Sequence, residues 1–254
     1  MRRILVTNDD GVHSPGIHAL ATALERLGEV VVVAPLTEAS AIGHALTLRR
    51  PLRIETVAPG RHAVDGTPTD CVNIALKVIL DGVLPDMVVS GINKGYNLGD
   101  DVTYSGTVAG ALEGALLGVP AIAVSLGQGG LAGANFGPAA EVAVAAAENL
   151  FARPLPSRVF LNINVPPGEL KGHRATVQGL RNHETSITAR VDPRGRSYYW
   201  IDELQCDWHD HAGSDYVAVR EGFVSVTPLH PDMTAHAHAG WVDLLDLTTR
   251  TAAR

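Results

Sequence analysis

Short apolar runs alternate with helix-like segments along the first 165 residues of the chain. Residues 3–7 form a short apolar run, and residues 30–34 are continuously apolar, as strands are when both faces of a sheet are covered. Between them, Ser14 and Pro15 are a suitable N-cap and first-turn pair for a helix that ends near Leu27. This order predicts a strand, a helix and a second strand, with the strands parallel.

The same alternation continues up to residue 165. Thr69 or Asp70 is suited to cap a helix that ends near Leu80. Further helices are expected over residues 105–117 and 139–151, and strands over residues 87–90, 121–125 and 159–165. Such alternation predicts an α/β fold with a doubly wound, mostly parallel sheet.

The pattern changes after Pro166. Short β-rich pieces follow at residues 175–178, 197–201, 216–219 and 224–227, with a DPRG turn signal at residues 192–195 and a weak helix-like run at 241–247. We expect a smaller β-rich C-terminal lobe or arm rather than more strands of the main sheet. The predicted organisation is one domain over residues 1–254, with a core over about 1–165 and an extension over about 166–254.

Composition and charge narrow the function classes. The chain has 254 residues, 46% of them hydrophobic, which is enough for one large core. A net charge of -7 argues against a nucleic-acid polymer as partner, and no apolar run reaches the roughly 18 residues of a membrane span. Two acids interrupt the first apolar run too early for a secretion signal, and two cysteines fit a reducing compartment, so we expect a cytoplasmic protein.

Polar residues follow three of the predicted strands. Asp9 and Asp10 come after the first strand, Ser40 lies in the loop after the second, and Asn93 follows the strand at residues 87–90. The loops after parallel strands share one edge of a sheet, where ligands bind in open α/β folds. Carboxylate, hydroxyl and amide oxygens suit Mg²⁺, Mn²⁺ or Ca²⁺ better than zinc, so these four residues are candidate metal ligands. An ordinary turn at the NDDG sequence is the alternative.

Ser105, Gly106 and Thr107 begin a predicted helix with glycines at every fourth position, at 106, 110, 114 and 118. A helix N-terminus offers free N–H groups and a positive dipole end to a phosphate, although simple capping by Ser105 is the alternative. Each interior glycine costs about 1 kcal/mol relative to alanine, so the stripe predicts close contact with a neighbouring element. A metal on one side of a phosphoryl group and a helix N-terminus on the other predict hydrolysis of phosphate monoesters. Either Asp9 or Asp10 would activate a water molecule, or its carboxylate would attack the phosphorus directly.

Five segments resemble the survival protein SurE family of nucleotidases, in order and across nearly the whole chain: ILVTNDDGVHSPG, SAIGHALT, GTPTDCV, VVSGINKGYNLGDDVTYSGTVAGALEGALLG and SVTPLHPDMT. The resemblance implies a Rossmann-like fold, a divalent metal, and release of phosphate from nucleoside 5′- and 3′-monophosphates. It also implies exopolyphosphatase activity in some members and homodimers or homotetramers formed through C-terminal arms. We expect one Mg²⁺ or Mn²⁺ ion per subunit.

By motif, the metal ligands of that family fall on the same four residues, Asp9, Asp10, Ser40 and Asn93. Its phosphate contacts fall on Asn97 and on Ser105, Gly106 and Thr107. His44 is a candidate substrate contact in the loop that carries Ser40, with structural hydrogen bonding as the alternative.

Other chemistry is less well supported by the sequence. For the pairs His209 and His211, and His236 and His238, we expect surface or interface positions rather than a zinc site. Cys71 is expected to be a buried apolar side chain rather than a nucleophile. The first strand-to-helix turn lacks G-x-G-x-x-G, which disfavours a dinucleotide-dependent oxidoreductase. A nucleotide sensor that binds without hydrolysis is the remaining alternative.

Overall fold

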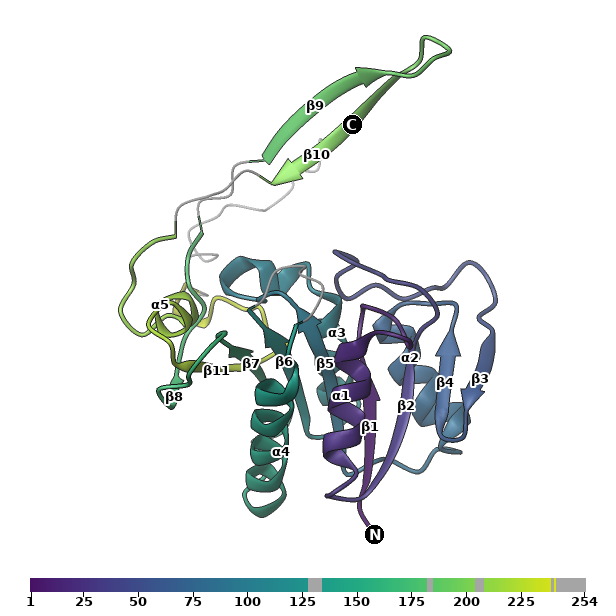
Figure 1. Ribbon diagram of the computed structural model, residues 1–254, viewed down its shortest axis with the longest axis vertical. Helices are drawn as coiled ribbons and strands as arrows, with labels where there is room; N and C mark the ends of the chain where they lie inside the picture. The colour runs from purple at the N-terminus through teal and green to yellow at the C-terminus, as the bar shows by residue number, and fades with distance from the viewer. Residues whose placement is uncertain (128–133, 182–184, 204–207, 239, 241–254) are drawn as a thin grey trace, which may run out of the picture.

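The computed structural model describes residues 1–127, 134–181, 185–203, 208–238 and 240. A nine-stranded sheet in the order β3-β4-β2-β1-β5-β6-β7-β11-β8 forms the middle layer, with helices on both faces (Figure 1). Its centre is parallel and consists of β1 (Arg3–Thr7), β2 (Glu29–Pro35), β5 (Met87–Lys94), β6 (Ala121–Leu126) and β7 (Phe160–Val165). The predicted doubly wound, mostly parallel α/β fold is confirmed.

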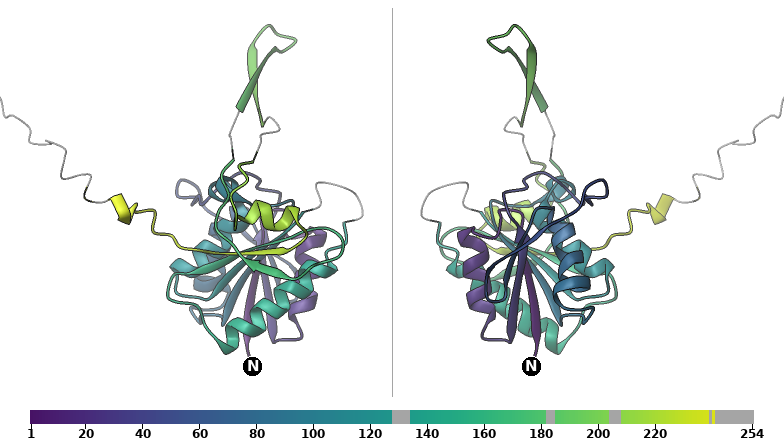
Figure 2. Two further views of the ribbon diagram at one scale, coloured as in Figure 1. Left: turned by 90° about the vertical axis from the view of Figure 1, so that its left-hand side faces the viewer. Right: turned by 90° about the vertical axis from the view of Figure 1, so that its right-hand side faces the viewer.

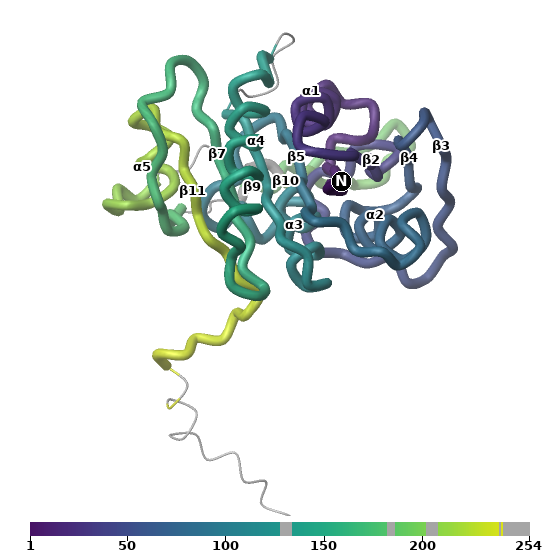
Figure 3. The backbone as a smooth tube through the Cα atoms, turned by 90° about the horizontal axis from the view of Figure 1, so that it is seen from below, coloured from purple at the N-terminus to yellow at the C-terminus, as the bar shows by residue number. Residues whose placement is uncertain are grey.

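Two pairs of helices cover the sheet, one pair on each face (Figure 3). The first pair is α1 (Pro15–Leu24) with α4 (Gly137–Ala152), and the second is α2 (Pro68–Ile74) with α3 (Gly106–Leu116). Each face has its own cluster of buried apolar side chains. Ile4 and Val6 of β1 pack on the α1 side, whereas Leu5 packs on the α2 side, because successive side chains of a strand point to opposite faces.

Most predicted elements lie within a few residues of their expected bounds, but the second helix begins earlier than predicted. Thr67, and not Thr69 or Asp70, is its N-cap, and Pro68 occupies the first turn. Thr67 and Asp70 form a capping box in which each side chain accepts from the other residue's backbone N–H. A π-helical turn, Ala75–Ile79, extends this helix, and none of the helices in the described part of the chain is long and apolar enough to cross a membrane.

The region after Pro166 divides into two parts. β9 (Thr185–Val191) and β10 (Ser197–Glu203) form a separate antiparallel hairpin that projects away from the body as the predicted arm (Figures 1 and 2). β8 (His173–Ala175) and β11 (Val224–Leu229) instead extend the main sheet. The expectation that no strands of this sheet follow Pro166 was therefore wrong, because β11 pairs antiparallel with β7 and β8 pairs with β11.

Two local predictions about strands were incomplete or wrong. Residues 216–219 were expected as a strand, but they lie in helix α5 (Asp215–Arg220), because the Ser214 hydroxyl caps it by accepting from the Val217 N–H. The hairpin of β3 (Ile54–Ala58) and β4 (Arg61–Val64) at the sheet edge was not predicted. Its strands are short, and β3 carries exposed and half-exposed residues without a buried face. The helix-like run at 241–247 lies outside the described residues.

The glycine stripe of α3 lets this helix lie directly on the sheet. A Cβ at Gly110 would be 2.8 Å from Ser90 Oγ and Thr7 Cγ2, and one at Gly114 would be 2.9 Å from Val88 Cβ. Gly118 follows the last turn with φ +82°, the left-handed conformation typical of a residue that ends a helix. The predicted close approach is therefore confirmed, and it fixes α3 over β1 and β5.

Candidate functional site

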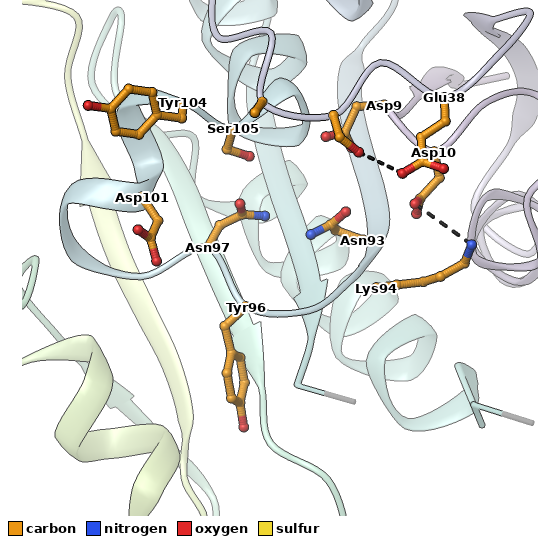
Figure 4. A pocket seen from close by; sticks show the side chains of 12 residues that line it. Asp9, Asp10, Glu38, Asn93, Lys94, Tyr96, Asn97, Asp101, Tyr104 and Ser105 are labelled. Atoms are coloured by element: carbon orange, nitrogen blue, oxygen red, sulfur yellow. Dashed lines mark hydrogen bonds and ion pairs between the residues drawn. The ribbon is translucent and has the colours of Figure 1, made fainter. Parts of the chain in front are cut away.

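A cavity of about 470 Å³ lies where the loops after β1, β2 and β5 meet at the carboxyl end of the sheet (Figure 4). Six of the nine predicted site residues line it: Asp9, Asp10, Ser40, Asn93, Asn97 and Ser105. Gly106, Thr107 and His44 are absent from the lining. The topology explains this convergence, because β2, β1 and β5 are adjacent parallel strands whose carboxyl ends share one edge.

Asp9 is buried against the first turn of α3. The Thr107 hydroxyl donates a hydrogen bond to its Oδ1. A Cβ at Gly106 would lie 2.7 Å from Asp9 Cβ, so only glycine lets the helix come this close. Burial raises the pKa of Asp9 to about 6, an effect that the Thr107 hydrogen bond opposes and the neighbouring Asp10 reinforces. The hydrogen bonds within the protein therefore only partly compensate the cost of burying the charged form of this carboxylate.

Asp10 lies beside Asp9 in a less buried position. Lys94 Nζ is 3.9 Å from its Oδ1, whereas its Oδ2 is buried without a hydrogen-bond partner. Burial raises the pKa of Asp10 above its ordinary value, the Lys94 ammonium opposes that rise, and Glu38 adds to it. A buried carboxylate oxygen with no donor that faces a polar cavity is suited to binding a cation.

Ser40 and Asn93 bring neutral oxygens to the same cavity. The Ser40 hydroxyl donates to Glu38 Oε1 at 2.6 Å, and the Asn93 amide donates to the Gly95 carbonyl at 3.1 Å. The register of β5 against β6 shifts between Gly91 and Asn93, an irregularity that alters side-chain direction at the strand end. In Figure 4 the side chains of Asp9, Asp10 and Asn93 are directed into one space.

These residues could hold a hard divalent cation. In the described part of the chain, no three His, Cys, Asp or Glu side chains are grouped so that they could hold a metal by themselves. A cation here would therefore need Ser40 and Asn93 oxygens in addition to the two aspartates. The donor set contains only oxygen, and the orphaned Asp10 Oδ2 supplies a ligand that no protein group satisfies.

Ser105 is the N-cap of α3 and also faces the cavity. Its hydroxyl accepts from the Val108 N–H at 3.1 Å, so the capping alternative is correct as a structural role. The Thr107 hydroxyl, two residues further on, donates to Asp9, and Thr107 itself does not line the cavity. A phosphate in this cavity would lie near the N-terminal end of an 11-residue helix, whose dipole favours an anion.

Asn97 is held by polar residues that sequence reasoning missed. Its N–H donates to Asn164 Oδ1 at 2.8 Å, and its carbonyl accepts from Asn162 and Asn164 amides at 2.8 and 3.0 Å. Its own amide donates to Ser125 Oγ at 2.7 Å. The signal was available, because these polar residues sit inside otherwise apolar runs near the ends of β6 and β7.

The C-terminal segment also supports the rim of the cavity. Asp215 is fully buried, and its carboxylate accepts from the N–H groups of Gly99 and Gly179, each at 2.8 Å. Arg181 forms two hydrogen bonds to Asp101, at 2.9 and 3.0 Å. Burial raises the pKa of Asp215, while these backbone N–H groups lower it. The segment after Pro166 therefore fixes the loop that leads from β5 to α3.

His44 lies away from the cavity lining and forms a link to helix α3. Its Nε2 is 2.6 Å from Glu113 Oε2, and the Asn73 amide donates to the other Glu113 oxygen at 2.6 Å. Glu113 is buried. The structure therefore favours the hydrogen-bonding alternative for His44, which ties the loop of Ser40 to α3.

The remaining sequence candidates are separate from this site. His209, His211, His236 and His238 are exposed, and His236 contacts Asp232 at 2.6 Å. Cys71 is fully buried, and burial raises the pKa of its thiol well above the ordinary value, which opposes a thiolate nucleophile. Cys206 lies outside the described residues.

Comparisons with known proteins agree over most of the chain. Residues 4–185 match the family model described as survival protein SurE. A protein of Syntrophotalea carbinolica named 5'-nucleotidase SurE is 55% identical over 91% of this chain and 92% of its own. A Geobacter sulfurreducens protein of the same name is 53% identical over 96% of this chain and 94% of its own. The crystal structure of Sure protein from Aquifex aeolicus superposes with a TM-score of 0.84 at 43% identity, covering 95% of this chain and 98% of that one.

Proposed function

Because the chain belongs to the survival protein SurE family, we propose that it is a metal-dependent 5′-nucleotidase that releases phosphate from nucleoside monophosphates. The observation that carries the proposal is the position of Asp9, which lies at the N-terminal turn of α3 and beside Asp10 in one cavity. A cation site and an anion site are thereby adjacent. A phosphate monoester needs both, because its charge must be neutralised while its bridging oxygen leaves.

Asp9, Asp10, Ser40 and Asn93 are the proposed ligands of one divalent ion, Mg²⁺ or Mn²⁺. When bound, such an ion withdraws charge from the phosphoryl oxygens and lowers the pKa of water. The carboxylates of Asp9, which is buried, and Asp10, which is partly buried, fit this role, since burial raises both of their pKa values and a cation would stabilise their charged forms.

The protein groups around the phosphate have separate proposed tasks. The N-terminal turn of α3, from Ser105 to Thr107, faces the phosphoryl oxygens with its dipole, and Asn97 fixes the opposite wall. Lys94 adds a positive charge near Asp10. The Asp9 and Asp10 pair orients the attacking water and accepts its proton, which places the nucleophile in line with the leaving alcohol.

The proposal extends to 3′-monophosphates and to polyphosphate, because all of the contacts proposed above are to the phosphate and none is to the sugar. It also extends to a homodimer or homotetramer built through the arm of β9 and β10. Ile187, Tyr199 and Ile201 on this arm are 67%, 64% and 74% exposed. Apolar side chains this exposed on one projecting hairpin favour burial against another subunit.

The test is phosphate release from a panel of 5′- and 3′-nucleoside monophosphates and a short polyphosphate, with Mg²⁺ or Mn²⁺ present. The proposal predicts that phosphate is released from the 5′-monophosphates. The rest of the panel shows whether 3′-monophosphates and polyphosphate are also hydrolysed. Calorimetric binding of the same nucleotides without any release would instead identify a nucleotide sensor. Size-exclusion chromatography with light scattering tests the assembly separately.

A further inference from the structure

Four carboxylates line the cavity, those of Asp9, Asp10, Glu38 and Asp101, together with the Lys94 ammonium. Asp9 and Asp10 are proposed metal ligands, and two hydrogen bonds from an arginine hold Asp101. The Lys94 ammonium is paired with Asp10, at 3.9 Å. Glu38 is therefore the lining carboxylate that has no task in the proposed site.

The contact of Glu38 is with Ser40, two residues further along the same loop. The Ser40 hydroxyl donates to Glu38 Oε1 at 2.6 Å, a short distance that is typical of a charged acceptor. Both residues are exposed and line the cavity, and Glu38 lies beside Asp10 (Figure 4). A bond between two exposed side chains contributes little to folding, so its main effect is on the orientation of the Ser40 hydroxyl.

The orientation of a hydroxyl decides what it offers to a ligand, because it has one proton and two lone pairs. While the Ser40 proton lies on the bond to Glu38, the Ser40 oxygen can only accept a hydrogen bond or coordinate a cation. Without this acceptor the O–H bond is free to rotate, and the proton can turn to an aspartate carboxylate that the cation needs. A charged acceptor also polarises the hydroxyl, which makes its oxygen a stronger donor to a metal.

We propose that Glu38 is a positioning residue for the divalent cation, because it holds the Ser40 hydroxyl with its lone pairs free for the metal. Glu38 acts through Ser40 and is not itself a ligand. The inference rests on the proposed function, since it requires a cation held by the four oxygen ligands described above. Groups that orient a metal ligand by a hydrogen bond contribute about 10- to 100-fold to metal affinity.

The negative charge of Glu38 is a separate effect, because it attracts any cation in the cavity whatever Ser40 does. Glu38→Gln and Glu38→Ala both remove this charge, but only glutamine keeps an oxygen that can accept from the Ser40 hydroxyl. A comparison of these two variants therefore cancels the charge and isolates the hydrogen bond. Both should fold, since Glu38 is exposed.

The experiment measures the dissociation constant of Mn²⁺ from chelator-treated protein by electron paramagnetic resonance of the free ion, up to millimolar concentrations. Glu38→Ala should bind Mn²⁺ about tenfold more weakly than Glu38→Gln. When Ser40→Ala is added to both variants, this difference should fall below twofold, because there is no hydroxyl left to orient. Glu169→Ala, at an exposed glutamate outside the cavity lining, is the control and should leave the constant unchanged.

Equal Mn²⁺ affinities of Glu38→Ala and Glu38→Gln would overturn the positioning role. A tenfold difference that persists with Ser40→Ala would overturn it as well, because Glu38 would then act without the hydroxyl. If the unmodified protein binds no Mn²⁺, both this inference and the proposed metal site are refuted. Mn²⁺ binding without phosphate release would refute the nucleotidase proposal alone, and the two comparisons of affinity would still decide the role of Glu38.

Discussion

The hydroxyl of Thr107, in the first turn of α3, donates a hydrogen bond to the carboxylate of Asp9, although the two residues are 98 positions apart in the sequence. This bond joins the helix end that is suited to phosphate with a carboxylate that is suited to a metal. It also occupies the hydroxyl that the sequence suggested for the phosphate itself. Thr107 thus orients Asp9, and we expect Ser105 and the backbone of the helix end, rather than the Thr107 hydroxyl, to contact a phosphate.

Replacing Thr107 with valine keeps the shape of the side chain and removes its donor. Asp9 then loses the group that lowers its pKa, so we expect the loss of about 1–3 kcal/mol in the free energy of unfolding at pH 7 and a reduced kcat for phosphate release. Thr107→Ser retains the hydroxyl and should behave nearly like the unmodified protein. A valine variant with unchanged stability and turnover would show that this bond is unimportant.

Asp9 should make the metal-free protein less stable as pH rises. Its pKa is about 6 in the folded protein, against an ordinary value of 3.8 for an aspartate side chain, so the folded state binds the proton more tightly. Its contribution is therefore fully present below pH 4 and is lost as pH rises through 6. Asp9→Asn, which keeps an oxygen for Thr107, should be equally stable at pH 4 and more stable at pH 7 by up to roughly 3 kcal/mol.

Chemical denaturation of both proteins in the presence of a chelator, at several pH values, measures this difference. If the difference in the free energy of unfolding between Asp9→Asn and the unmodified protein is the same at pH 4 and pH 7, the raised pKa of Asp9 is contradicted. Asp9→Asn should be the more stable protein at pH 7 and yet release no phosphate, so the loss of activity would not come from unfolding.

Gly106→Ala should strongly reduce activity even though alanine favours helices by about 1 kcal/mol. The new Cβ would meet Asp9 Cβ at 2.7 Å and force the helix end away from the carboxylate. A displacement near 1 Å can reduce turnover by roughly 100-fold. Gly240→Ala is the control, because no atom lies within 4 Å of its Cβ and its φ is ordinary. Full activity of the Gly106 variant would show that close contact at this position is unnecessary.

Much of the fold and part of the site could be predicted because the relevant signals are local. Asp9, Asp10 and Asn93 lie close to the ends of buried parallel strands, so the strand pattern itself places them at one edge. The partners Asn162, Asn164 and Asp215 could not be assigned in the same way, since their contacts join residues 36 to 116 positions apart. Helix α5 is too short for its period to be read, and only the Ser214 cap marks its start.

His44→Ala should loosen the loop that carries Ser40. The buried Glu113 would keep its hydrogen bond with Asn73 but lose its hydrogen bond with His44, which should lower the free energy of unfolding by an amount on the order of 1 kcal/mol. We expect weaker Mn²⁺ binding by calorimetry and a lower kcat, and His44→Gln should rescue both because it can still donate to Glu113. Equal metal affinity in the alanine variant and the unmodified protein would separate His44 from the metal site.

The central claim is that a divalent cation bound by Asp9, Asp10, Ser40 and Asn93 is required for phosphate release. The most direct measurement uses chelator-treated protein, with Mg²⁺, Mn²⁺, Ca²⁺ or Zn²⁺ restored singly, and records Mn²⁺ binding and phosphate release from a nucleoside 5′-monophosphate. We predict no release without metal, recovery with Mg²⁺ or Mn²⁺, and loss of both Mn²⁺ binding and release in Asn93→Ala with an unchanged far-UV circular dichroism spectrum. Full release from the metal-free protein, or undiminished Mn²⁺ binding by Asn93→Ala, would contradict the account.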